Sequence, residues 1–246
     1  MQYRVSRVIA GPFLHVLWRP QITGGEHIPA SGGAILASNH LSIVDSIFLP
    51  LMLSRPVTFA AKSEYFTGTR LIDRVTGAYM RATKQLSVDR AGARAAQDML
   101  EAALGLLREG ALFGIYPEGT RSPDGRLYRG RTGIGWLALH SGLPVIPVAM
   151  SGTDHVLPPG HKVPRVARIK IAIGKPLTFE QFRDQPAGAR QRRAVTDEVM
   201  QAIRALSGQE YVPMYASVRK EELAASNGSA PARRQGESHL PGSPEA

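Results

Sequence analysis

The chain has 246 residues, which suits one large α/β domain or two small ones, and its hydrophobic fraction of 43% is enough for a substantial core. It contains no cysteine, which excludes a disulfide framework, a cysteine nucleophile and any thiolate metal site. The formal net charge is +10, and residues 216–246 hold as many acidic as basic side chains. The excess positive charge therefore belongs to the preceding part of the chain and would attract nucleic acid, an anionic membrane or a phosphorylated substrate.

The N-terminal residues have the apolar periodicity of an amphipathic helix. Apolar positions recur at helical spacing, with arginines around them and a tryptophan at the end: Val5, Val8, Ile9, Pro12, Phe13, Val16, Leu17, Arg4, Arg7, Arg19 and Trp18. The run between Arg7 and Arg19 would span roughly 16 Å as a helix, about half of a hydrocarbon core, so no membrane-crossing helix is predicted. We expect residues 1–24 to lie on a membrane in the plane of the bilayer; the alternative is a helix packed on the protein's own core.

Beyond this segment, short apolar runs alternate with helical patterns. Strands are predicted at residues 34–38, 57–61, 85–88, 111–116, 144–149 and 168–173. Helices are predicted at residues 43–53, 91–109, 132–140 and 191–206. Strands separated by helices predict an α/β fold with a mostly parallel or mixed central sheet flanked by helices. We expect this domain to span residues 25–216 and the Ser-, Gly-, Pro- and charge-rich residues 217–246 to be disordered.

The segment Asn39-His40-Leu41-Ser42-Ile43-Val44-Asp45 lies where a predicted strand ends and a helix begins. On one straight helix, His40 and Asp45 would be roughly 140° apart and would not meet. If His40 lies in the loop and Asp45 in the first helical turn, the carboxylate can reach back to the imidazole. Such a pair fixes the tautomer of a general base that activates a hydroxyl. The alternative is a helix start capped by Asn39 or Ser42.

A second segment, Tyr116-Pro117-Glu118-Gly119-Thr120-Arg121-Ser122, also follows a predicted strand. Its glycine would let the backbone approach a ligand closely, while the guanidinium of Arg121 could hold an anion. Further arginines follow in the sequence and add positive charge: Arg126, Arg129 and Arg131. The alternative is an ordinary surface loop that contains an ion pair.

The pattern N-H-x-S-x-x-D, followed further along the chain by P-E-G-T-R, resembles the glycerolipid acyltransferase family, in particular the bacterial 1-acyl-sn-glycerol-3-phosphate acyltransferases. Two weaker blocks of that family can be placed in order: residues 62–66 together with 86–90, and residues 145–148. The resemblance covers roughly residues 25–175.

The resemblance implies a role for each residue that matches a block. His40 would be the general base on the acceptor hydroxyl, and Asp45 would orient it. The implied substrate-binding residues are Asn39, Lys62, Arg90, Glu118, Gly119, Thr120 and Arg121. The implied reaction moves a fatty acyl group from a thioester to the free hydroxyl of a 1-acylglycerol 3-phosphate and gives phosphatidic acid. Backbone N–H groups at the start of the helix could hold the oxyanion.

These implications set the expected partners. The co-substrate is an acyl-CoA or an acyl carrier protein thioester, the acceptor is a lysophospholipid, and neither a cofactor nor a metal is expected. We expect a peripheral or monotopic protein on the anionic, cytoplasmic face of the cell membrane, with no nucleic-acid partner.

Several alternatives stay open at this point. Many family members have clear membrane helices before the first block, whereas this chain has a short broken one, so the acceptor could be glycerol 3-phosphate or another lipid. A non-catalytic basic module that binds lipid or nucleic acid is the second alternative.

A further motif, the G-x-G-x-x-A match at residues 133–138, follows a basic loop rather than a strand, so we interpret it as helix packing and not as a dinucleotide site.

Overall fold

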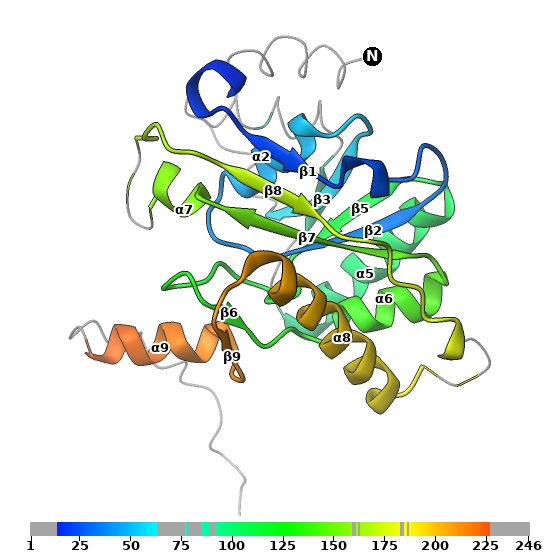
Figure 1. The fold of residues 1–246 in the computed structure, drawn as a ribbon. Coiled ribbons are helices and arrows are strands. Elements are labelled where there is room, and N and C mark those ends of the chain that lie inside the picture. The colour runs from blue at the N-terminus through cyan, green and yellow to red at the C-terminus, as the bar shows by residue number, and fades with distance from the viewer. Residues whose placement is uncertain are drawn as a thin grey trace, which may run out of the picture.

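The computed structural model describes residues 14–62, 77, 85–88, 92–158, 161, 163–182, 185 and 187–226 (Figure 1). Its strands are β1 (Gln21–Thr23), β2 (Ala34–Ser38), β3 (Val57–Lys62), β4 (Leu86–Val88), β5 (Leu112–Ile115), β6 (Leu127–Tyr128), β7 (Val145–Ser151), β8 (Lys170–Ile173) and β9 (Tyr211–Val212). Its helices are α2 (Asp45–Met52), α5 (Gly92–Arg108), α6 (Gly133–Ser141), α7 (Thr153–Val156), α8 (Ala189–Ser207) and α9 (Ala216–Ser226), with 3₁₀ turns η1 (Gly25–His27) and η2 (Glu180–Phe182).

Seven of the described strands form one sheet in the order β1-β8-β7-β2-β5-β3-β4. Strands β7, β2, β5, β3 and β4 run parallel, whereas β8 is antiparallel to β7 and β1 is parallel to β8. The predicted mostly parallel or mixed sheet is therefore confirmed. Because β2 lies at its centre, all five residues of this strand are buried.

Helices cover both faces of the sheet (Figure 1). Ile35 and Ala37 of β2 point to the face covered by α5, α6 and α8, where they pack in one apolar cluster. Ala34 and Leu36 of the same strand point the other way, toward α2. This alternation follows from the two-residue period of a strand. The result is a three-layer arrangement with an apolar core on each side of β2.

The predicted helices and strands lie close to the observed ones, but the chain beyond residue 216 does not match the prediction. Residues 217–226 are not disordered, because Ala216–Ser226 form α9. This helix is held by polar contacts: the guanidinium of Arg131 donates to Ser217 Oγ at 3.2 Å, and Lys220 Nζ donates to Thr120 Oγ1 at 2.6 Å. Ala216, where the helix begins, is fully buried. Residues 227–246 lie outside the described part of the chain.

Most of the predicted N-terminal amphipathic helix, residues 1–13, also lies outside the described residues. Residues 14–18 are helical. Leu14 is buried and the Trp18 ring meets the edge of Phe48 with 5.7 Å between ring centroids, whereas Val16 is 74% exposed. Of the helices in the described part of the chain, none combines the length and hydropathy that crossing a bilayer requires.

The G-x-G-x-x-A pattern packs one helix against another, as interpreted from the sequence. Gly135 lies in α6 where this helix crosses α8, and a Cβ atom at this position would come within 2.1 Å of the carbonyl oxygen of Arg192. Backbone cannot move away as easily as a flexible side chain, so only glycine fits at this crossing.

We therefore expect Gly135→Ala to lower the free energy of unfolding by about 1–3 kcal/mol, because the added methyl group would push α6 away from α8. Gly105→Ala is the matched control. Gly105 is exposed in α5, a Cβ atom added there would have no neighbour within 4 Å, and alanine favours helix over glycine by about 1 kcal/mol. Denaturant unfolding of both variants checks the prediction, and equal stability of the two would contradict it.

Candidate active site

The two sequence blocks meet at one edge of the sheet. Parallel strands β2, β5 and β7 all end at this edge, which is where reactive side chains gather in α/β folds. The loop 39–44 leaves β2 and the loop 116–122 leaves β5, the strand next to it. Strand β8 begins at the same edge, since Lys170 pairs with Ser151 at the end of β7.

His40 and Asp45 are in contact. His40 lies in the loop and Asp45 is the first residue of α2, and 2.9 Å separates His40 Nδ1 from Asp45 Oδ2. The same oxygen accepts the backbone N–H groups of Leu41 and Ser42, each at 2.8 Å. The carboxylate is fully buried, while the imidazole is 16% exposed. A carboxylate can only accept, so Nδ1 carries the ring proton and Nε2 keeps its lone pair.

The backbone of His40 is held on both sides by the loop that follows β5. Its N–H donates to Glu118 Oε1 at 3.1 Å, and its carbonyl oxygen accepts the N–H of Ser122 at 2.7 Å. Arg121 precedes Ser122 directly and is exposed. The loop that carries Arg121 is therefore held directly against the backbone of His40.

Aromatic rings fix the orientation of the imidazole. The ring of Tyr116 lies flat on that of His40, with 3.8 Å between centroids and an interplanar angle of 10°. Tyr116 stacks in turn on Phe59 of β3, at 5.1 Å and 21°. Phe59 occupies the space above Gly114, where a Cβ atom would lie 2.2 Å from the ring. One face of the histidine is thus covered by a column of rings that starts in the core.

Glu118, a predicted substrate-binding residue, is held between two backbone segments. It is fully buried, and its second oxygen accepts the N–H of Tyr128 at 2.9 Å. Burial raises its pKa to about 7, against the opposing effect of the backbone N–H groups of Tyr128 and His40. Glu118 thus connects the His40 loop to β6, and its substrate-binding role stays a prediction.

Asn39, another predicted substrate-binding residue, is hydrogen-bonded to the backbone of the neighbouring strand β7. It is fully buried, its Oδ1 accepts the N–H of Met150 at 2.7 Å, and its Nδ2 donates to the carbonyl oxygen of Met150 at 2.9 Å. The amide side chain thereby continues the pairing of β2 with β7 beyond the end of β2. Nδ2 also donates to Gln209 Oε1 at 2.8 Å, which connects this edge to the end of α8.

The remaining predicted binding residues have different outcomes. Gly119 has a φ of 72°, a left-handed conformation that favours glycine, and Arg131 lies across it. Thr120 accepts the hydrogen bond from Lys220 of α9. Lys62 ends β3, but its side chain, like all of Arg90, lies outside the described part of the chain.

Two chemical roles are constrained by these contacts. The N–H groups of Leu41 and Ser42 are used by Asp45 and that of His40 by Glu118, so the predicted oxyanion role has no free donor among these three. The Ser42 hydroxyl is buried and donates to the carbonyl oxygen of Leu157 at 2.9 Å, which removes it as a nucleophile. In the described residues, no group of three or more His, Asp or Glu side chains is arranged to hold a metal ion.

Comparison with known proteins places this site in a family. A family model described as Acyltransferase matches residues 19–151, which is more than half of the chain and includes both loops. The chain belongs to the acyltransferase family. The family resemblance inferred from the two sequence blocks is thereby confirmed.

Several relatives in this family carry a more specific name. A 1-acyl-sn-glycerol-3-phosphate acyltransferase of Bacillus subtilis is 29% identical over 74% of this chain and 84% of its own length. The chloroplastic 1-acyl-sn-glycerol-3-phosphate acyltransferase BAT2 of Brassica napus is 29% identical over 70% of this chain. The chain spans about half the length of such plant relatives. The crystal structure of the 1-acyl-sn-glycerophosphate acyltransferase PlsC of Thermotoga maritima matches 83% of this chain and 78% of its own, with a TM-score of 0.63 and 25% identity.

Three residues of this acyltransferase-family site were not singled out from the sequence. Tyr116 covers the imidazole, Ser122 holds the His40 carbonyl, and Lys220 reaches Thr120 from α9. Tyr116 and Ser122 flank the P-E-G-T-R motif, so their position in the sequence was a usable signal. Lys220 had none, because it lies in a segment whose composition predicts disorder.

The buried Glu118 should make stability depend on pH. Its native pKa of about 7 lies above the ordinary value of 4.5, so the native state keeps a proton that the unfolded chain releases. This contribution to stability is complete below pH 4.5 and is lost as the pH rises through 7. Relative to Glu118→Gln, the free energy of unfolding of the wild type should therefore fall across this range, by at most about 1.4 kcal/mol per pH unit.

Urea unfolding of both proteins at a series of pH values measures this difference. The glutamine side chain of the variant also turns an N–H₂ group toward one backbone N–H, which lowers its free energy of unfolding. This loss is the same at every pH, so it does not affect the slope of the free energy of unfolding against pH. Glu26→Gln, at an exposed position in η1, controls for the loss of a carboxylate. A difference between wild type and Glu118→Gln that stays constant with pH would show that the pKa is not raised.

Proposed function

We propose that this chain transfers a fatty acyl group from a thioester donor, acyl-CoA or acyl carrier protein, to the free hydroxyl of a 1-acylglycerol 3-phosphate, giving phosphatidic acid. His40 is the general base and Asp45 orients it. The proposal draws its substrate class from the names of the relatives in Bacillus, plants and Thermotoga. It draws its chemistry from the described site.

The observation that supports this chemistry most directly is the direction of the His40 ring. Nδ1 is occupied by Asp45, one ring face is covered by Tyr116, and the side chain is still 16% exposed. The nitrogen that remains for proton transfer is Nε2, at the edge opposite Asp45. A histidine oriented by a buried carboxylate is suited to remove a proton from a hydroxyl, because the carboxylate stabilises the imidazolium that forms.

The proposed acyl transfer needs no covalent intermediate on the protein. Nε2 accepts the proton of the acceptor hydroxyl while the oxygen bonds to the thioester carbonyl carbon. The tetrahedral intermediate then collapses, the C–S bond breaks, and the imidazolium returns its proton to the departing thiolate. Both substrates must be bound at once for this route, and the buried Ser42 hydroxyl offers no nucleophile for a two-stage one.

The acceptor phosphate is assigned to the loop that carries Arg121. A guanidinium can form two parallel hydrogen bonds with phosphate oxygens, and Arg121 forms no ion pair with a carboxylate of the described residues. Arg90, predicted from the sequence to share this role, remains a proposal because it lies outside the described residues.

We expect His40→Ala to reduce acyl transfer by roughly 100- to 10,000-fold while the protein stays folded, since general-base catalysis contributes about that factor. His140→Ala, an exposed histidine of α6, is the matched control. Incubation with acyl-CoA and acyl carrier protein thioesters, each with 1-acylglycerol 3-phosphate, glycerol 3-phosphate or 1-acylglycerol, and measurement of product mass identify donor and acceptor. A folded His40→Ala protein with wild-type turnover would contradict the mechanism.

The same experiment separates the alternatives. Product from glycerol 3-phosphate alone would keep the catalytic pair and change the acceptor, and product from 1-acylglycerol alone would remove the phosphate role of Arg121. If no thioester is consumed with any acceptor, the chain would be a basic binding module instead. Among these, the transferase is favoured by the oriented His40, which a binding module would not require.

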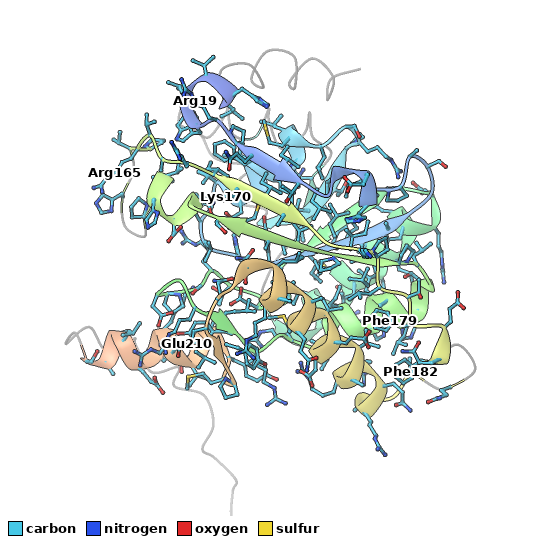
Figure 2. All side chains as sticks on the ribbon, in the orientation of Figure 1. Arg19, Arg165, Lys170, Phe179, Phe182 and Glu210 are labelled. Carbon is cyan, nitrogen blue, oxygen red and sulfur yellow. The ribbon has the colours of Figure 1, made fainter. Side chains whose placement is uncertain are left out.

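We further propose that the protein works on an anionic membrane surface, as its lipid acceptor requires. The support is a patch that we call the apolar-basic surface: Val16, Val163 and Val166, which are 74%, 75% and 74% exposed, with Arg19 and Arg165 beside them. The Trp18 indole N–H donates to the carbonyl oxygen of Arg165 at 2.7 Å, so the two segments lie together. Figure 2 shows Arg19 and Arg165 at the end of the molecule where β8 begins.

This surface lies at the same sheet edge as the catalytic loop. Strands β1 and β8 begin where β2 and β7 end, so the residues just before them are carried to the side of the molecule where His40 lies. Exposed aliphatic side chains insert into the interfacial region of a bilayer, and each arginine near an anionic surface adds about 1 kcal/mol of attraction. Docking through this surface would bring the acceptor headgroup toward the site.

The double substitution Val163→Asp and Val166→Asp should weaken co-sedimentation with anionic phospholipid vesicles by roughly tenfold or more, because two charges would have to enter the interface. Turnover of a short-chain, water-soluble acceptor should be retained. Val218→Asp, at an exposed valine of α9, is the control. Equal vesicle binding by the double variant and the wild type would contradict the proposed surface.

A further inference from the structure

Helix α9 brings a lysine into the loop that the proposed function assigns to the acceptor phosphate. Lys220 Nζ donates to Thr120 Oγ1 at 2.6 Å, although the two residues are 100 positions apart in the sequence. Thr120 lies between Gly119 and Arg121 in the loop that holds the His40 backbone. Lys220 is therefore part of the same site, and one of its three N–H donors is used by Thr120.

The cations around this loop carry positive charge that nearby carboxylates do not pair. Neither Arg121 nor Lys220 forms an ion pair with a carboxylate of the described residues. Arg131 lies over the Tyr215 ring, 5.2 Å from its centroid, and donates to Ser217. By contrast, Arg219 of the same helix pairs with Asp124 and Glu222. The unpaired positive charge of Arg121 and Lys220 is therefore concentrated where α9 meets the loop.

We infer that Lys220 is a substrate-binding residue that acts with Arg121 to bind the phosphate group of the acceptor. The inference rests on the proposed function for the choice of acceptor. A phosphate monoester carries close to two negative charges at neutral pH, so two cations match it better than one. Arg121 offers a planar pair of donors and Lys220 a compact charge, a combination that surrounds a tetrahedral anion from two sides.

The electrostatics of the site agree with this assignment. Burial lowers the pKa of Lys220, and the neighbouring Arg121 lowers it further, while Glu118 acts in the opposite direction. Two cations held close together repel until an anion lies between them. Phosphate binding would remove this repulsion and raise the pKa again, so acceptor affinity should decline at alkaline pH as Lys220 loses its proton.

Three full-length variants test the inference. Lys220→Met removes the charge and keeps much of the side-chain volume, and Lys220→Arg keeps the charge. Lys175→Met is the control, because Lys175 is exposed just beyond the end of β8, at the sheet edge opposite His40. Two readouts are used: calorimetric titration with glycerol 3-phosphate, and steady-state kinetics with 1-acylglycerol 3-phosphate and acyl-CoA.

We expect Lys220→Met to weaken glycerol 3-phosphate binding roughly tenfold and to raise the KM for the phosphorylated acceptor by a similar factor. The kcat and the thioester KM should stay within about twofold of wild type, and Lys175→Met should match wild type throughout. In the wild type, the acceptor KM should rise at alkaline pH, and in Lys220→Arg this rise should disappear because arginine stays charged.

Several outcomes would overturn the inference. Wild-type glycerol 3-phosphate affinity in Lys220→Met would show that Lys220 does not contact the phosphate, and losses of equal size in Lys220→Met and Lys220→Arg would assign the lysine to the packing of α9. A change in the thioester KM alone would place its charge on the phosphates of coenzyme A. Calorimetry keeps this test separate from the proposed function: absence of acyl transfer by the wild type refutes the function, whereas the binding comparison still decides the role of Lys220.

Discussion

The carboxylate of Asp45 is buried at the start of α2 and accepts three hydrogen bonds on one oxygen, from the His40 ring and from two backbone N–H groups. Burying a charged carboxylate is costly unless donors compensate for the lost water. Because two of the donors are backbone N–H groups of the loop, the same carboxylate oxygen fixes both the conformation of the loop and the orientation of the imidazole. Glu118 repeats the arrangement from the other side, with backbone donors from His40 and Tyr128. The position of His40 is therefore fixed by hydrogen bonds from its loop to two buried acidic side chains, Asp45 and Glu118.

Much of this could be predicted from the sequence because it depends on local spacing. The five-residue separation of His40 and Asp45 excluded a shared helical face and required a loop followed by a helix start, which is the observed geometry. The alternation of strands and helices predicted the sheet, since period and turn residues are local properties. What local pattern could not predict was exposure. Asn39 and Glu118 belong to motifs that suggest ligand contact, and only tertiary packing shows that both are buried and paired with backbone groups.

Helix α9 was missed for a different physical reason. Its residues lack the apolar stripe by which an amphipathic helix is recognised, and their composition resembles that of a disordered segment. The helix is instead held by hydrogen bonds to Thr120 and from Arg131, and by arginine contacts with the ring of Tyr215, which precedes it. Polar docking of this kind depends on partners about 100 residues away, so no window of sequence contains it. The two-residue strands β6 and β9 escape prediction in the same way.

The Glu118 contacts also have a consequence for biosynthesis. His40 and Asp45 leave the ribosome early, yet the loop between them is completed by the carboxylate of Glu118, which itself needs the N–H of Tyr128. At a translation rate of about 5–20 residues per second, several seconds separate the appearance of His40 from that of Tyr128. Until β5 is synthesised, β2 has neither of its neighbours β5 and β7 in place, and its two unpaired edges are open to other strands. The nascent chain should therefore depend on chaperones most strongly before β5 emerges, and the loop that carries His40 is completed only once synthesis has passed Tyr128.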